Sequence, residues 1–113
     1  MLNGVTTMLK WKTESVIIAT ALDEVLNPAL AGMSGKNRVI KWLGSPTISG
    51  LDLHVYRDAE QIVNVDVTLF TTAFRLLQVD LPLAEGQLCN AGFKDTGAGT
   101  GTYKLIIGYE EAE

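Results

Sequence analysis

The sequence contains one cysteine, Cys89, and one histidine, His54. A lone cysteine cannot form an intrachain disulfide, so packing or assembly must hold the fold together. Zinc sites use sets of several cysteine and histidine ligands, and a catalytic histidine needs partner residues of its own. We therefore predict no catalytic, metal or cofactor site. Cys89 is expected to be a small buried hydrophobic residue and His54 an outward-facing strand residue.

Long apolar runs are also missing. The longest, residues 16–22, contains Thr20 and reaches about a third of the ~20 residues that a membrane helix requires. The chain starts with a mixed polar segment, whereas a secretory signal has a basic region followed by a long apolar one. We expect neither a membrane span nor signal-directed export.

Basic residues are few and scattered. Nine lysines and arginines stand against thirteen aspartates and glutamates, which gives a formal net charge of −4. Nucleic-acid binding depends on clustered Lys and Arg that neutralise phosphates, so this balance argues against a nucleic-acid partner. The closest basic group, Lys36, Arg38 and Lys41, fits a solvated strand edge, because lysine often protects exposed edges.

What the sequence does have is alternation of apolar and polar residues in short runs. The clearest cases are 51–55, 63–67, 77–83 and 103–109, with Gly, Pro, Asp and Asn residues between the runs. A period of two is typical of half-buried β-strands. Eight candidate strands can be drawn, over residues 5–12, 15–22, 38–43, 51–56, 61–67, 74–83, 87–94 and 102–110.

Short strands separated by turn residues at intervals of roughly ten positions predict an all-β fold. We expect one domain over residues 1–113, an eight-stranded antiparallel β-sandwich in which two sheets pack face to face. A closed barrel is the other arrangement that fits the pattern. A domain of this size buries roughly 65% of the surface of its unfolded chain, so one core suffices.

Two segments in the first third of the chain are less regular. Residues 15–22 are rich in β-branched residues, which favours a strand, but the apolar positions of 15–25 also fit a helical stripe that ends before Pro28. Residues 27–37 hold a proline, two glycines and two asparagines. We expect them to form a loop of about ten residues that can carry a contact.

Two polar features have simple explanations. The carboxylates of Asp52, Asp66 and Asp80 fall on the outward side of candidate strands, and no loop has the dense Asp and Asn spacing of a calcium motif. The glycine-rich segment 97–101 lacks the spacing of phosphate-binding loops and precedes a strand rather than a helix. We expect a solvated sheet surface and a flexible hairpin tip whose glycines permit positive φ.

The aromatic residues can form a sugar-binding platform, or they can pack in the core and at subunit contacts. Packing is favoured, because apolar residues flank the aromatic positions in the strands 38–43 and 102–110. In 38–43, alternation places Ile40 with Trp42 and Val39 with Leu43, so both faces are apolar and a partner is expected to cover one of them. The residues predicted to form this interface are Ile40, Trp42, Pro28, Met33, Tyr56 and Tyr109.

Three motifs stand out in the rest of the chain: RVIKWLG before a polar loop, the hairpin LDLHVYRDAEQIVNV, and the closing segment VDLPLAEGQLCNAGFKDTGAGTGTYKLIIGYEE. With these motifs, residues 38–111 resemble the small single jelly-roll virion proteins of phages and archaeal viruses. The turn L-x-L-x-E-G-Q and the ending IIGYEE carry most of this resemblance.

The resemblance implies a β-sandwich of the jelly-roll type and a non-enzymatic structural protein of the virion, either in the capsid or in its vertex or decoration complexes. The implied partners are copies of the protein itself, in a homo-oligomer, and other capsid subunits. No catalytic residues come with the resemblance. The alternative function is that of a carbohydrate-binding or receptor-binding β-sandwich module that uses exposed aromatic residues.

Overall fold

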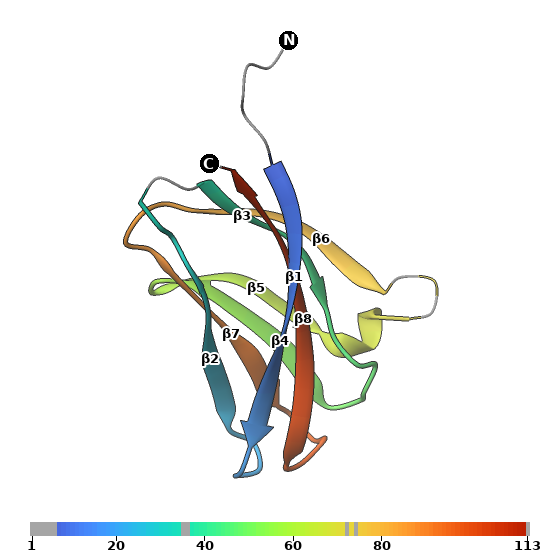
Figure 1. The fold of residues 1–113 in the computed structure, drawn as a ribbon. Coiled ribbons are helices and arrows are strands. Elements are labelled where there is room, and N and C mark those ends of the chain that lie inside the picture. Colours follow the sequence, from blue (N-terminus) through green and yellow to red (C-terminus); the bar gives the residue numbers. More distant parts are fainter. Residues whose placement is uncertain (1–6, 35–36, 72, 74, 113) are drawn as a thin grey trace.

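The computed structural model describes residues 7–34, 37–71, 73 and 75–112, and it shows two packed four-stranded antiparallel sheets (Figure 1). The first sheet has the strand order β1-β8-β3-β6 and the second has the order β2-β7-β4-β5. The strands are β1 (Thr7–Ile18), β2 (Glu24–Ala31), β3 (Asn37–Gly44), β4 (Leu51–Arg57), β5 (Glu60–Asp66), β6 (Leu76–Leu83), β7 (Leu88–Asp95) and β8 (Gly101–Ala112). A short 3-10 helix, η1 (Val67–Leu69), follows β5.

Successive strands alternate between the two sheets, except at the hairpin of β4 and β5. This connectivity is that of a jelly roll, and it confirms the predicted eight-stranded antiparallel sandwich. The closed barrel is excluded, since the strands form two separate sheets of four.

The core lies between the sheets and follows the predicted alternation. Leu51, Leu53 and Val55 of β4 are fully buried, as are Ile107 of β8 and Cys89 of β7. Each such aliphatic side chain contributes about 1.5–3 kcal/mol when it leaves water. Burial also raises the pKa of the Cys89 thiol to about 11. The prediction that Cys89 is a small buried hydrophobic residue is confirmed.

The first strand differs from the prediction. Instead of two strands over 5–12 and 15–22, one twelve-residue strand, β1, crosses the intervening positions and ends at Ile18. It pairs with β8 without a register shift, so every described residue of β1 has a partner in the ladder. The helical alternative for 15–25 is wrong, because these residues form the end of β1, a turn and the start of β2. Residues 5, 6, 36 and 74 lie outside the described residues.

The loop predicted for 27–37 is wrong in its first half, where β2 continues to Ala31. Pro28 does not interrupt this strand because β2 lies at the edge of the second sheet, paired only with β7. The register against β7 also shifts between Pro28 and Leu30. Edge strands and bulges are the places where a sheet tolerates the missing proline N–H.

At one end of the sandwich, the buried carboxylate of Asp95 joins two loops. It accepts hydrogen bonds from the backbone N–H groups of Leu22 at 2.9 Å, Gly97 at 2.9 Å and Gly99 at 3.0 Å. These bonds favour the charged carboxylate and lower its pKa to about 2. Asp95 therefore fixes the turn after β1 against the loop between β7 and β8.

The same loop is held by Gly50, which precedes β4. The carbonyl oxygen of Gly50 accepts hydrogen bonds from the N–H groups of Thr96 at 2.9 Å and Ala98 at 3.0 Å. Gly50 has a φ of +89°, and a Cβ at this position would lie 2.5 Å from the Ala98 nitrogen. The prediction of a hairpin tip at 97–101 is wrong, because this loop joins β7 of the second sheet to β8 of the first, although Gly97 and Gly99 do have the expected positive φ.

Candidate functional site

The outer face of the first sheet carries an aromatic pair around a glycine. Gly108 of β8 lies opposite Trp11 of β1 and Trp42 of β3. A Cβ on Gly108 would lie 2.7, 2.9 and 3.0 Å from three carbon atoms of the six-membered part of the Trp11 ring. The indole thus rests directly on the backbone of β8. Trp11 nevertheless remains 49% exposed, so the rest of its ring is available for contact.

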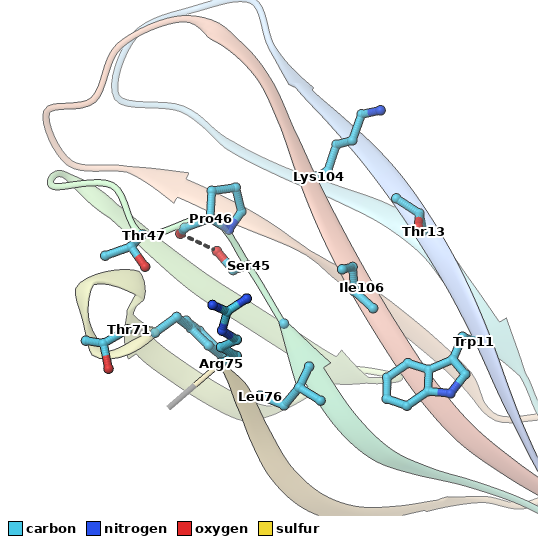
Figure 2. Close-up of a pocket in the computed structure, with 12 residues that line it drawn as sticks. Trp11, Thr13, Ser45, Pro46, Thr47, Thr71, Arg75, Leu76, Lys104 and Ile106 are labelled. Atoms are coloured by element: carbon cyan, nitrogen blue, oxygen red, sulfur yellow. Dashed lines mark hydrogen bonds between the residues drawn. The ribbon is translucent and has the colours of Figure 1, made fainter. Parts of the chain in front are cut away.

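Beside Trp11, the same face is hollowed into an open groove with a volume of about 880 Å³. Strands β1, β3 and β8 contribute to it on one side, and the loops that follow β3 and precede β6 contribute on the other (Figure 2). A groove of this volume falls in the range of small-molecule sites, about 300–1,000 Å³. The residues that line it are Trp11, Thr13, Gly44, Ser45, Pro46, Thr47, Phe70, Thr71, Arg75, Leu76, Lys104 and Ile106.

The groove combines an apolar floor with a polar rim. A Cβ on Gly44 would lie 2.9 Å from the Leu76 side chain and 3.6 Å from that of Ile106, so these two side chains close over bare backbone. Serine and threonine hydroxyls surround the floor, together with the cationic side chains of Arg75 and Lys104. None of the described residues that line the groove is acidic. The groove is therefore locally cationic on a chain whose net charge is −4.

A second polar cluster covers part of the outer face of the second sheet, around His54. The Nδ1 atom of His54 contacts Oε2 of Glu24, and its Nε2 lies 3.1 Å from the amide oxygen of Asn64. Oε2 of Glu24 also accepts a hydrogen bond from the Tyr56 hydroxyl at 3.2 Å. Desolvation, with the nearby Glu24 carboxylate, raises the pKa of Tyr56. His54 lies on the predicted outward side, but these neighbours bury it to 9% exposure.

The His54 cluster links the edge strands β2 and β5 across β7 and β4. In the described part of the chain, neither hydrogen-bond partner of His54 carries a nucleophilic hydroxyl or thiol, as a nucleophile–base pair requires. The described residues also contain no group of three or more His, Cys, Asp or Glu side chains that could hold a metal ion. Within the same ranges, no helix has the length and apolar character to cross a membrane. The His54 cluster therefore joins strands of the second sheet through side-chain hydrogen bonds.

In the described residues, the two members of the predicted basic group, Arg38 and Lys41, each pair with a carboxylate. Nε of Arg38 lies 2.7 Å from the carboxylate of Glu111, which is only 6% exposed and which also pairs with Lys10 at 2.6 Å. Lys41 pairs with Asp80 at 2.8 Å. These cations are used within the fold. The expectation of a strand edge is wrong for Arg38 and Lys41, because β3 lies between β8 and β6.

Among the six residues predicted for an interface, the prediction is wrong for Ile40, because this residue is fully buried in the core. The register of β3 shifts between Ile40 and Trp42 against both of its neighbours, β6 and β8. This irregularity at Lys41 lets Ile40 face the core while Trp42 lies on the outer face. Simple alternation, which puts Ile40 and Trp42 on one side, fails at such a shift.

The other five residues do not form one surface. Trp42 is half-buried on the first sheet, and Tyr109 packs partly against the core with the Arg38 guanidinium 5.9 Å from its ring centroid. Pro28 is exposed on β2, Met33 is 47% exposed beyond the end of that strand, and Tyr56 belongs to the His54 cluster. The interface role of these residues stays a prediction.

The sequence analysis does not identify Arg75, Lys104 or Ile106 as site residues. Alternation in β8 does place Lys104 and Ile106 on the side opposite the core residues Leu105 and Ile107. Recognising the groove also requires the strand order, which places β1 and β3 on either side of β8 and brings the segment before β6 to the same face.

No family model and no curated protein matches the sequence. Among solved structures, the chain is similar to the nucleoplasmin-like N-terminal domain of Drosophila FKBP39, with a TM-score of 0.49 and 14% sequence identity. The similarity covers 96% of this chain and 92% of that chain. A likeness at this level says nothing about function.

Proposed function

We propose that the protein is a non-enzymatic structural subunit that assembles with copies of itself. We place this assembly in a virus particle, in the capsid or in its vertex or decoration complexes. The resemblance of residues 38–111 to small jelly-roll virion proteins supports the setting. Exposed apolar side chains on an edge strand support the assembly.

That strand is β1, at the edge of the first sheet. By the alternation of the strand, its Leu9, Trp11 and Ile17 side chains share one face. These side chains, here named the β1 surface, are 43%, 49% and 62% exposed. One edge of β1 pairs with β8, and no described strand pairs with the other edge. An edge strand with exposed apolar side chains invites contact with other chains, and apolar patches on soluble proteins mark contact sites. This is the observation that carries the proposal.

A second copy packed against the β1 surface would remove these side chains from water. Each fully covered aliphatic side chain contributes about 1.5–3 kcal/mol to such a contact. If the contact joins β1 to a different surface of the neighbour, it is heterologous and closes into a ring when the rotation between copies allows it. Rings of this kind are the units from which shells and vertices are built.

The test is the oligomeric state in solution, measured by light scattering after size exclusion and by sedimentation velocity. We expect the protein to be an oligomer at micromolar concentration, and the double variant Leu9→Lys, Ile17→Asp to be a folded monomer with an unchanged circular-dichroism spectrum. Ile62→Lys is the matched control, because Ile62 is 37% exposed on β5 of the other sheet. A monomeric parent protein, or a double variant that assembles like the parent, contradicts the proposal.

The viral setting has its own test. Negative-stain electron microscopy of the purified protein, alone and mixed with particles of a virus that encodes it, should show closed regular assemblies and occupancy at defined positions on the particle. Irregular aggregates with no attachment to particles would count against a virion role.

A further inference from the structure

We infer that the turn between β1 and β2 of one copy docks onto the outer face of the first sheet of the next copy. Leu22 of the turn then meets the apolar floor of the groove, and Asp23 meets Lys104. This inference rests on the proposed function, and it names the two surfaces that come together when copies assemble. The receiving surface consists of Trp11, which belongs to the β1 surface, with Ile106 and Lys104 of β8.

Leu22 is an exposed leucine in a backbone conformation that leucine rarely adopts. Its φ is +67°, and the residue is 62% exposed. The other non-glycine residue with positive φ in the described part of the chain is Asp58, and aspartate is common in this conformation. Burial within the single chain does not offset the strain at Leu22. Strain that persists at an exposed position points to a functional contact outside the chain.

The turn holds Leu22 in a fixed place. The N–H group of Leu22 donates to the Asp95 carboxylate at 2.9 Å, and its carbonyl oxygen accepts a hydrogen bond from the ammonium group of Lys94. The N–H group of Asp23 donates to the carbonyl oxygen of Thr20 at 3.3 Å, and its own carbonyl oxygen accepts from the N–H of Asp95 at 2.9 Å. The turn is thereby fixed at one end of the sandwich, beside the loop between β7 and β8 (Figure 1). A group that is already held in place loses little entropy on docking.

The receiving surface offers apolar contact to Leu22. Trp11 and Ile106 are 49% and 41% exposed on the neighbouring strands β1 and β8. Beside Ile106, the side chain of Leu76 lies over the bare backbone of Gly44 and completes the apolar floor. Docking removes apolar surface from water on both copies, which is the dominant favourable term in most protein association.

Asp23 and Lys104 make the two surfaces complementary in charge. Both residues are exposed, and within the described residues neither side chain has an ion-pair or hydrogen-bond partner. Asp23 follows Leu22 in the turn, and Lys104 lies two positions from Ile106 on the same side of β8. Each surface therefore carries an apolar side chain beside a charge of opposite sign. One exposed ion pair adds little affinity, but a like charge in its place opposes docking, so the pair selects this arrangement.

A second copy fits the turn better than a lipid surface does. Both complementary surfaces belong to the same chain, and because they differ, the contact is heterologous and repeats from copy to copy until a ring closes. An anionic lipid surface can take up an exposed leucine, but it repels the carboxylates of Asp23 and Glu24, which are both exposed beside Leu22.

The experiment is sedimentation velocity with light scattering on the full chain, over a concentration series. We expect Asp23→Lys and Lys104→Glu each to raise the dissociation constant of the assembly about tenfold or more. The double variant Asp23→Lys, Lys104→Glu should return to within about threefold of the parent, because the reversed charges attract again. Such a rescue requires that the two residues meet across copies.

Glu85 supplies the matched control, because it is exposed in the turn between β6 and β7, at the other end of the sandwich (Figure 1). Glu85→Lys changes the net charge as Asp23→Lys does, and it should assemble like the parent. Glu85→Lys, Lys104→Glu has the same net charge as the rescued double variant. It should nevertheless assemble as weakly as Lys104→Glu alone.

Leu22→Gly separates docking from a role in the fold of the single chain. Glycine adopts positive φ without strain, so in the Lys104→Glu background this substitution should leave the melting temperature equal or higher. In the parent background it should weaken assembly about tenfold or more, because the apolar contact is lost. Unchanged assembly together with a lower melting temperature would overturn the docking role of Leu22.

The outcomes distinguish this inference from the proposed function. A parent protein that is monomeric overturns both. An oligomeric parent whose Asp23, Lys104 and Leu22 variants assemble equally well overturns the inference alone, as does a double charge reversal that fails to restore assembly. Binding of the parent to phosphatidylserine vesicles that is lost in Leu22→Gly, with assembly unchanged, would assign the turn to a lipid surface and overturn the inference as well.

Discussion

Substitution of Gly50 by alanine tests how the loops at one end of the sandwich are held. Gly50 and Gly86 have nearly the same φ, +89° and +87°. An alanine in this conformation costs about 1–2 kcal/mol of strain, and about 0.4–1 kcal/mol is recovered because the unfolded chain becomes less flexible. Gly86→Ala, whose Cβ would meet nothing within 4 Å, should therefore lose only about 1 kcal/mol of unfolding free energy.

Gly50→Ala carries the same strain and a backbone clash. Its Cβ would lie 2.5 Å from the nitrogen of Ala98 and 2.7 Å from the carbonyl carbon of Gly97, so the loop must move away. That movement breaks the two hydrogen bonds that Gly50 accepts from Thr96 and Ala98. At about 0.5–1.5 kcal/mol each, their loss adds about 1–3 kcal/mol and brings the total to about 2–4 kcal/mol.

Urea denaturation of the parent and both variants, followed by circular dichroism, gives the three unfolding free energies. The expected order is parent, then Gly86→Ala, then Gly50→Ala, with a similar dependence on urea in all three. If Gly50→Ala is no less stable than Gly86→Ala, the loop is not held by Gly50 and the argument is wrong.

Three further predictions concern single side chains. The pKa of Asp95 lies at about 2 in the fold and at 3.8 in the absence of structure, so its contribution to stability is complete above the higher value and is lost as the pH falls through the lower one. Urea midpoints between pH 4 and pH 2 should show this loss in the parent and a smaller one in Asp95→Asn; equal slopes would refute it. Leu81→Asp places an unpaired charge at a position that is 3% exposed, at a cost of several kcal/mol against a total of about 5–15, so it should not fold. A cooperative melt at the parental temperature would show that this position does not face the core. The Cys89 thiol, with a pKa of about 11 and no exposure, should react with a thiol reagent at pH 8 only when the protein is unfolded. Rapid modification of the native protein would contradict its burial.

The second half of the chain could be predicted from sequence because its strands alternate without interruption. Leu51, Leu53 and Val55 point inward, and the short polar turn to β5 is a hairpin with antiparallel register. A period of two is a local property, so it needs no knowledge of the partner strands. The sandwich class follows from it directly.

The first half could not be predicted in the same way, because its structure depends on partners distant in sequence. The length of β1 is set by twelve residues of β8, and Pro28 is accepted because β2 lies at an edge. The shift at Lys41 reverses the expected side of Ile40 relative to Trp42. None of these conditions is visible in the local pattern.

The groove required still more distant information. Leu76 and Ile106 are unremarkable in sequence, and they line one groove with Trp11 because the first sheet has the strand order β1-β8-β3-β6. The role of Asp95 was missed as well, although an aspartate before two closely spaced glycines is a known signal for a side chain that caps its own loop.

The burial of Cys89 has a practical consequence for the study of this molecule. With its one natural sulfhydryl shielded behind the β7 backbone, a cysteine engineered on the surface would be the only site that a maleimide dye or spin label reaches in the native fold. The proposed assembly can then be tested by fluorescence transfer or electron resonance between labelled copies without first replacing the natural residue.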